Sequence, residues 1–182
     1  MTSFRGIRRF TKMISIAGLV ATVAISAQAA DTKAEPKAAA PDKISETYGA
    51  WTLTCGAKRQ GCHISQALFR RKDKARILNV AVYRGAGKNK PLIFRTLAPL
   101  GLKLSAGVSV TIDKGKPAKI PFIACLRIGC IADVPLNDGL EKALRAGKAM
   151  QVDLTAFAQS RKIQMKLNLN GFSRALDRLN SI

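Results

Sequence analysis

Four cysteines fall in two closely spaced pairs, and this spacing constrains the fold more than any other feature of the chain. Cys55 and Cys62 flank one short segment, and Cys125 and Cys130 flank another. Both segments contain glycine, which favours turns, and both adjoin apolar sequence. We therefore predict two β-hairpins, each closed by its own disulfide. Pairing between the two hairpins stays an alternative, because four cysteines allow three connectivities.

The stretch around the second pair, residues 122–130 (FIACLRIGC), is apolar. We expect it to lie deep in the folded domain, as the counterpart of the first hairpin. A zinc site is the rival interpretation of the cysteines. Zinc ribbons usually space their ligands as C-x2-C to C-x4-C, whereas six residues separate the first pair here and the single histidine, His63, adjoins Cys62. We therefore predict disulfides and no metal site.

A redox or catalytic centre is not indicated either. Disulfide oxidoreductases typically use C-x-x-C in a βαβ setting, and neither feature is present. His63 would need an activated serine or cysteine beside it to act as a base. Its neighbouring cysteine is expected to be oxidised, and no G-x-S-x-G motif occurs. We therefore expect no enzymatic activity and no cofactor, with a hydrolase as a remote third hypothesis.

The first 29 residues have the three parts of a secretory signal peptide. A basic region at 1–12 precedes an apolar run at 13–26, and Ala27-Gln28-Ala29 fits a small-x-small cleavage site. The apolar run is shorter than the roughly 20 residues that span a bilayer, so we favour cleavage near Ala29 over a retained anchor. Arg8-Arg9 leaves twin-arginine export open beside the default Sec route. Export to the periplasm or beyond agrees with disulfides, because the periplasm oxidises thiols.

The next segment predicts a linker. Residues 31–43 are rich in Ala, Lys and Pro and contain no large apolar side chain. Such a segment cannot bury enough surface to offset its ordering entropy. We assign residues 30–47 to a flexible linker and residues 48–182 to a single domain.

From Tyr48 onward, apolar and polar residues alternate with a period of two, which is typical of strands with one dry face. The pattern occurs at 51–55, 62–68, 78–82, 91–97, 108–112, 152–155 and 162–169. Two segments have helical spacing instead: 137–146, with Asn137 as its cap, and 172–179. This order predicts a mainly β fold, an antiparallel β-sandwich of immunoglobulin-like type or a partly open barrel, with two short helices. Trp51 is expected in the core against the first disulfide, with ligand stacking as the alternative.

The chain is strongly basic, with a formal net charge of +20, and its sharpest charge feature is one short run. The basic residues of that run are Arg70, Arg71, Lys72, Lys74 and Arg76. The ordinary interpretation of such a run is a solvated hairpin loop. The functional interpretation is a site for an anionic partner, such as a lipid, lipopolysaccharide, an acidic glycan or an acidic protein. Nucleic acid is a poor fit, because export removes the protein from it and the run lacks interleaved stacking aromatics.

Several motifs occur together and in order along residues 48–179. They are Trp51-x3-Cys55, Cys62-x3-Gln66, Ala98-Pro99-Leu100-Gly101-Leu102 followed by Gly107 and Ile112-Asp113, Phe122-x2-Cys125-x4-Cys130, and Gly171-Phe172-x2-Ala175. In this order they resemble the invasion-associated locus B family of exported bacterial proteins. The resemblance implies a small β-sandwich in the periplasm or at the cell surface, associated with entry into host cells, and it brings no enzymatic activity or cofactor.

Two hypotheses about function follow. The first is an exported, non-enzymatic binding protein of the periplasm or envelope that uses its basic surface on an anionic partner of the envelope or of a host surface. The alternative is a structural or accessory envelope protein with no soluble ligand.

Overall fold

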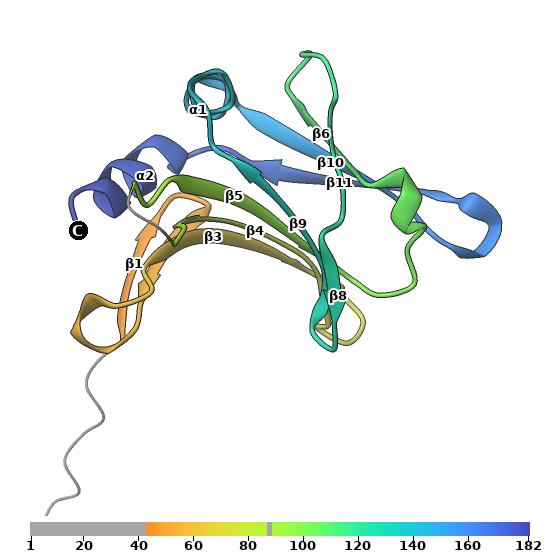
Figure 1. Ribbon diagram of the computed structural model, residues 1–182, viewed down its shortest axis with the longest axis horizontal. Helices are drawn as coiled ribbons and strands as arrows, with labels where there is room; N and C mark the ends of the chain where they lie inside the picture. Colours follow the sequence, from red (N-terminus) through yellow and green to blue (C-terminus); the bar gives the residue numbers. More distant parts are fainter. Residues whose placement is uncertain (1–42, 87–88) are drawn as a thin grey trace, which may run out of the picture. The chain divides into compact units, whose positions relative to one another are not determined.

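The computed structural model describes residues 43–86 and 89–182. The predicted signal peptide and most of the predicted linker lie outside these residues. In the described part the strands form two antiparallel sheets, and neither sheet closes into a barrel (Figure 1). The mainly β, sandwich-like architecture predicted from the alternating pattern is therefore confirmed.

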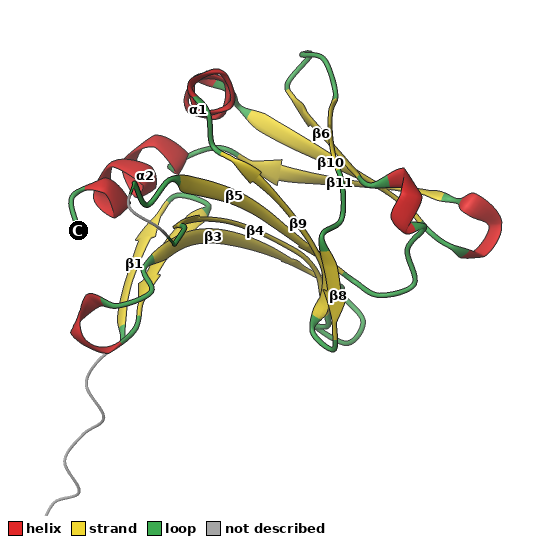
Figure 2. Ribbon diagram, in the orientation of Figure 1, coloured by secondary structure: helices red, strands yellow, loops and turns green. Residues whose placement is uncertain are grey.

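Sheet 1 is seven-stranded, in the order β1-β2-β3-β4-β5-β9-β8. Its strands are β1 (Ile44–Tyr48), β2 (Trp51–Cys55), β3 (His63–Phe69), β4 (Arg76–Arg84), β5 (Leu92–Ala98), β9 (Gly129–Pro135) and β8 (Ala124–Leu126). Sheet 2 is four-stranded, in the order β11-β10-β6-β7. Its strands are β11 (Lys162–Asn168), β10 (Ala149–Thr155), β6 (Val108–Ile112) and β7 (Ala118–Ile120). Short 3-10 turns lie in three of the connections: η1 (Ala57–Arg59), η2 (Leu104–Ala106) and η3 (Ala158–Ser160) (Figure 2).

The core lies between the sheets and is built by the alternation that the sequence predicts. Every second residue of β2 faces it, so that Trp51, Leu53 and Cys55 are completely buried. The predicted inward residues of β4, β6, β10 and β11 join the same cluster. Because successive side chains of a strand point to opposite faces, the polar residues between them face outward.

Two helices complete the domain close to where the sequence places them. Helix α1 (Asp138–Ala146) begins after Asn137, whose side chain accepts a hydrogen bond from the backbone N–H of Leu140 at 2.9 Å. This bond satisfies one of the free N–H groups at the start of the helix. Helix α2 (Phe172–Asn180) packs on β1 and β2 (Figure 1). Its Phe172 meets Trp51 edge to face at a centroid distance of 4.9 Å, so Trp51 is a core residue.

The domain begins earlier than the predicted boundary at Tyr48. Strand β1 pairs with β2 along its whole length, from Ile44 opposite Cys55 to Tyr48 opposite Trp51. Residues 44–47 are therefore part of sheet 1 and not of a linker. The segment has only one large apolar residue before Tyr48, so its strand character comes from backbone pairing with β2 rather than from an apolar face of its own.

The stretch 122–130 does not lie deep in the domain, and this prediction was wrong. Among the strands that the structure describes, β8 is an edge of sheet 1 and has β9 as its single partner. Ile123, Leu126 and Ile128 are 60%, 54% and 63% exposed. The hairpin turns at Arg127 and Ile128, and β9 begins with Gly129, where φ is +134° and a side chain would collide with the carbonyl oxygen of Ala98. Residues 123–128 are exposed, whereas Phe122 packs against the core and Cys130 is buried.

Candidate binding surface

Both disulfides close their own hairpins, as the cysteine spacing predicts. Cys55 ends β2 and bonds to Cys62, just before β3, with a Cα–Cα distance of 4.1 Å. Cys125 and Cys130 face each other across the β8–β9 ladder, with a Cα–Cα distance of 3.9 Å. All four cysteines of the chain are thereby paired, which leaves no thiolate to bind zinc or to react.

His63 lies at the start of β3, beside the first disulfide. Its Nδ1 lies 3.2 Å from the carbonyl oxygen of Gly61, and its side chain is partly exposed at the start of β3. Within residues 43–86 and 89–182, no group of three or more His, Cys, Asp or Glu side chains is arranged to hold a metal ion. The histidine is best described as part of the flank of the first hairpin.

The predicted basic run occupies the turn between β3 and β4, which we call the basic loop (residues 70–76). Backbone bonds close it, from the N–H of Arg70 to the oxygen of Ala75 at 2.8 Å and from the N–H of Lys74 to the oxygen of Arg70 at 2.9 Å. Arg70 donates to both carboxylate oxygens of Asp73, at 2.8 and 2.6 Å. This pairing lowers the pKa of Asp73 to about 2, so the carboxylate stays charged and occupies Arg70.

The other four cations of the basic loop are exposed and, among the described residues, lack an acidic partner. They are Arg71, Lys72, Lys74 and Arg76. The structure therefore brings the predicted site residues together around the β3–β4 turn, with Arg70 paired to Asp73 and Arg76 at the start of β4.

Exposed apolar side chains gather at the same end of the domain, which the sequence analysis did not anticipate. Among the described residues, every exposed large apolar side chain except Ile182 lies at the end of β3, in the β5–β6 connection, in or beside the β8–β9 hairpin or just before η3, and we call this set the apolar end. Its members are Phe69, Leu100, Leu104, Ile123, Leu126, Ile128 and Phe157.

Strand register shows why these segments meet. Asn79 of β4 pairs with Leu97 of β5, and Ala98 of β5 pairs with Cys130 of β9. The β3–β4 turn, the end of β5 and the β8–β9 turn consequently lie at the same end of the strands of sheet 1, where neighbouring strands are about 4.8 Å apart. Figure 1 shows the yellow loop between β3 and β4 and the tip of β8 at this end of the strands.

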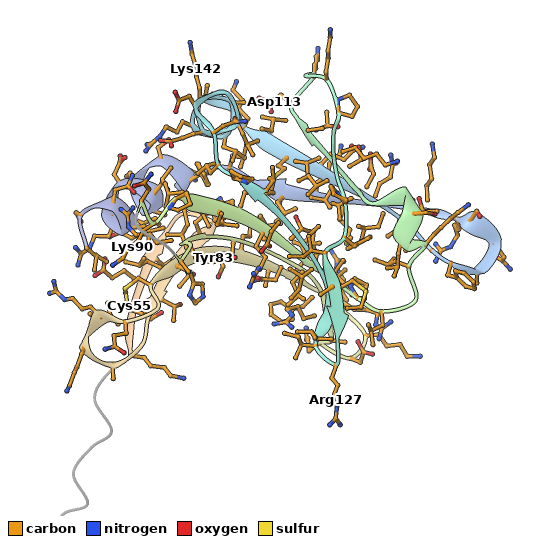
Figure 3. The ribbon with its side chains drawn as sticks, viewed as in Figure 1. Cys55, Tyr83, Lys90, Asp113, Arg127 and Lys142 are labelled. Carbon is orange, nitrogen blue, oxygen red and sulfur yellow. A yellow bond between two sulfur atoms is a disulfide. The ribbon has the colours of Figure 1, made fainter. Side chains whose placement is uncertain are left out.

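Sheet 2 contributes its loops to the same end. The N–H of Lys103 donates to the oxygen of Thr155, and the N–H of Phe157 donates to the oxygen of Gly101, both at 2.8 Å. These bonds hold η2 and η3 beside the connection that leaves β5. Figure 3 shows Arg127 at the β8–β9 turn, pointing away from the domain. The end of the molecule thus combines exposed apolar groups with exposed cations.

A polar cluster on the outer face of sheet 1 was also not predicted. Arg95 donates to Asp133 at 2.8 and 2.6 Å and to the hydroxyl of Tyr83 at 2.7 Å, and that hydroxyl donates to Asp133 at 3.0 Å. Burial and the neighbouring Asp133 raise the pKa of Tyr83. The three groups satisfy one another across β4, β5 and β9 and leave no free charge. The cluster therefore stabilises sheet 1 by linking β4, β5 and β9. It forms because strand register places these three side chains side by side.

No helix in the described ranges is long and apolar enough to cross a membrane.

Comparisons of sequence and of structure with known proteins lead to the same protein family. Residues 51–180 match the family model described as Invasion associated locus B (IalB) protein. A Brucella abortus (strain 2308) invasion protein B homolog is 30% identical over 141 residues, which cover 76% of this chain and 80% of the relative.

One further relative aligns over more of the chain, and one solved structure shows the same fold. Invasion protein B of Bartonella bacilliformis is 23% identical over 185 residues, covering 94% of this chain and 98% of that protein. The crystal structure of invasion associated protein B from Bartonella henselae has a TM-score of 0.66 at 27% identity, and covers 76% of this chain and 96% of that one. Because the family model matches most of the domain and the fold agrees, the chain belongs to the invasion associated locus B family.

Proposed function

We propose that this chain is an exported, non-enzymatic binding protein of the periplasm or envelope that engages an anionic component of the envelope or of a host surface through the basic loop. One observation carries the proposal. Arg71, Lys72 and Lys74 lie in the β3–β4 turn and Arg76 begins β4, and all four are exposed and without acidic partners among the described residues. The acid within the loop, Asp73, is already bound by Arg70.

Two further facts support the proposal. Local disulfides on both hairpins suit a protein that works in an oxidising compartment. The names of the Brucella and Bartonella relatives refer to invasion, which makes a host surface a reasonable place to seek the partner.

The physical expectation is a salt-dependent attraction. Each basic side chain near an anionic surface contributes about 1 kcal/mol. The Debye length falls from about 30 Å at 0.01 M salt to about 8 Å at 0.15 M, so binding through exposed cations weakens as salt rises. Immobilised lipopolysaccharide, heparin as an acidic glycan, and vesicles containing phosphatidylglycerol are suitable probes.

The decisive variant is Lys72→Glu/Lys74→Glu, measured on each probe at low and physiological salt. We expect at least a tenfold weaker affinity on the probe that binds, with little change in stability because both side chains are exposed. The matched control is Lys114→Glu/Lys116→Glu, a pair of exposed lysines in the β6–β7 turn. Equal losses of affinity in the two variants would show that binding depends only on the net charge of the protein. No loss in either would overturn the proposal and favour a structural or accessory envelope protein.

A further inference from the structure

We infer that the anionic partner is a lipid bilayer and that the apolar end inserts into its interface, led by the tip of the β8–β9 hairpin. The inference rests on the proposed function and names the class of its partner. The hairpin tip consists of Leu126, Arg127 and Ile128, and its two apolar side chains are 54% and 63% exposed.

The exposed apolar groups are the observation that requires an explanation. Scattered apolar side chains are normal on a protein surface, but exposed apolar side chains concentrated in a few connections call for an account of what they contact. Here the group occupies the connections at one end of both sheets, while the rest of the described surface carries only Ile182 as a large exposed apolar residue. Selective placement at loop tips suits contact with a surface more than contact with a small molecule.

The hairpin is held in the shape that insertion needs. Cys125 and Cys130 are joined directly behind the tip, and Leu126 pairs with Gly129 across it. Gly129 lies so close to the carbonyl oxygen of Ala98 that the turn is fixed against β5. A tip that is already ordered loses little conformational entropy on docking.

Backbone chemistry limits the depth of insertion. Among the described strands β8 pairs only with β9, so the outer edge of β8 has backbone groups that no described strand pairs with. Unpaired backbone N–H and C=O groups are not tolerated in the hydrocarbon core. The side chains of Leu126 and Ile128 therefore enter the boundary between headgroups and acyl chains, while the strand stays at headgroup level.

The charge around the apolar end favours an anionic bilayer. The loops at this end are residues 70–75, 99–107, 121–128 and 156–161. Their single acidic residue is Asp73, which forms an ion pair with Arg70. Their other basic residues are Arg71, Lys72, Lys74, Lys103, Arg127 and Arg161. Cations that surround an apolar tip can bind lipid phosphates while the tip enters the interface.

A second copy of the chain fits the same surface less well. In a two-fold contact each patch meets its own copy, so the basic loops and Arg127 of both partners would face one another. Cores of protein–protein interfaces are also depleted in lysine. An acidic protein with an apolar groove is the remaining competitor, and the experiment below separates it from a bilayer.

The first test compares two variants on two probes. Leu126→Asn/Ile128→Asn should bind vesicles of phosphatidylcholine and phosphatidylglycerol at least tenfold more weakly than the wild type, and should bind heparin equally well. Lys72→Glu/Lys74→Glu should weaken binding to both probes. Ile182→Asn is the control for loss of an exposed apolar side chain elsewhere. Wild-type binding to the vesicles should also retain a part that high salt does not remove, since insertion is not screened.

The outcomes separate the two proposals. If Leu126→Asn/Ile128→Asn binds vesicles like the wild type while the lysine variant does not, the anionic site stands and insertion is overturned. If neither vesicles nor heparin nor lipopolysaccharide bind the wild type, the proposed function fails, and the inference fails with it. If the protein does not bind vesicles but tightly captures an acidic protein, the inference that its partner is a bilayer is also overturned.

A second test reports insertion directly. Ile128→Trp places a fluorophore at the tip, and the native Trp51 is completely buried and so gives a constant background. We expect a blue shift of the emission on anionic vesicles and quenching by brominated acyl chains. Ile182→Trp should show neither change. An unquenched, unshifted Trp at position 128 on vesicles that the protein demonstrably binds would show contact without insertion, and would overturn the inference.

Discussion

The side-chain amide of Gln66 pairs in both directions with the backbone of Asn168, as a further strand residue would. Its Nε2 donates to the Asn168 oxygen at 2.9 Å, and its Oε1 accepts from the Asn168 N–H at 3.0 Å. The same Nε2 donates to the oxygen of Ala50, and the indole of Trp51 donates to Asn168 at 3.0 Å. Gln66 thereby joins β3 of sheet 1 to β11 of sheet 2. Motif residues that carried the family resemblance therefore hold the sandwich together.

We predict that Gln66→Leu lowers the free energy of unfolding by about 3 kcal/mol, because it removes three part-buried hydrogen bonds and takes the side-chain partner from the Asn168 N–H and the Ala50 oxygen. Urea denaturation followed by Trp51 fluorescence measures the loss. Gln164→Leu is the control, since Gln164 is exposed on β11 and should change stability by less than about 0.5 kcal/mol. Equal stability of the two variants would show that the Gln66 bonds are replaced by solvent.

Gly171→Ala should destabilise the domain by about 3 kcal/mol or more. Its φ is +89°, and a Cβ there would collide with the carbonyl oxygen of Tyr48, which is fixed in β1. Gly101→Ala separates strain from crowding, because Gly101 has a φ of +84° but open space around its Cβ position. That control should lose only about 1 kcal/mol. Similar thermal unfolding midpoints for both variants would contradict the crowding argument.

Glu46 should contribute to stability in a pH-dependent way. Arg178 donates to both of its carboxylate oxygens, and Tyr48 donates to one; these bonds lower the pKa of Glu46 from 4.5 to about 2. A carboxylate whose pKa is lowered in the folded state stabilises above its unfolded pKa, and that contribution disappears as the pH falls from about 4.5 to 2. Glu46→Gln should therefore be less stable than the wild type at pH 7, with the gap closing over this range. Urea midpoints at several pH values measure the gap; a constant gap would refute the prediction.

Thr96→Val should leave stability unchanged or raise it by up to about 1 kcal/mol. Thr96 is completely buried in β5, and its hydroxyl has no hydrogen-bond partner among the described residues. Valine has nearly the same shape and removes an unpaired polar group from the core. A measured loss above 1 kcal/mol would mean that the hydroxyl is bonded in solution.

The disulfide pairing can be checked on native protein. Digestion with trypsin without reduction can cleave after Lys58 and after Arg127, within the two hairpin loops. The expected products link Cys55 to Cys62 and Cys125 to Cys130. The intact mass should be lower by four hydrogens than that of the reduced chain. A peptide that joins one hairpin to the other would refute the local pairing.

Local pattern was sufficient for much of this protein. Alternation of apolar and polar residues predicts which side chains of β2, β4 and β10 face the core, because the side-chain period of a strand is independent of its neighbours. Asn137 predicts the start of α1 for a similar reason, since a cap acts within a few residues. The short spacing within each cysteine pair predicts the disulfides. The basic loop is likewise evident from the run of Arg and Lys.

Other features depended on partners that are distant in sequence. Ile44–Tyr48 became a strand because β2 lay beside it, and the cluster of Tyr83, Arg95 and Asp133 exists only through strand register. The apolar run 122–130 has the composition of a core segment, yet β8 is an edge among the described strands and its residues are exposed. Apolar composition determines that burial is favourable, but which surface provides it depends on the arrangement of the sheets. That arrangement alone brought Leu126 and Ile128 to the same end as the basic loop.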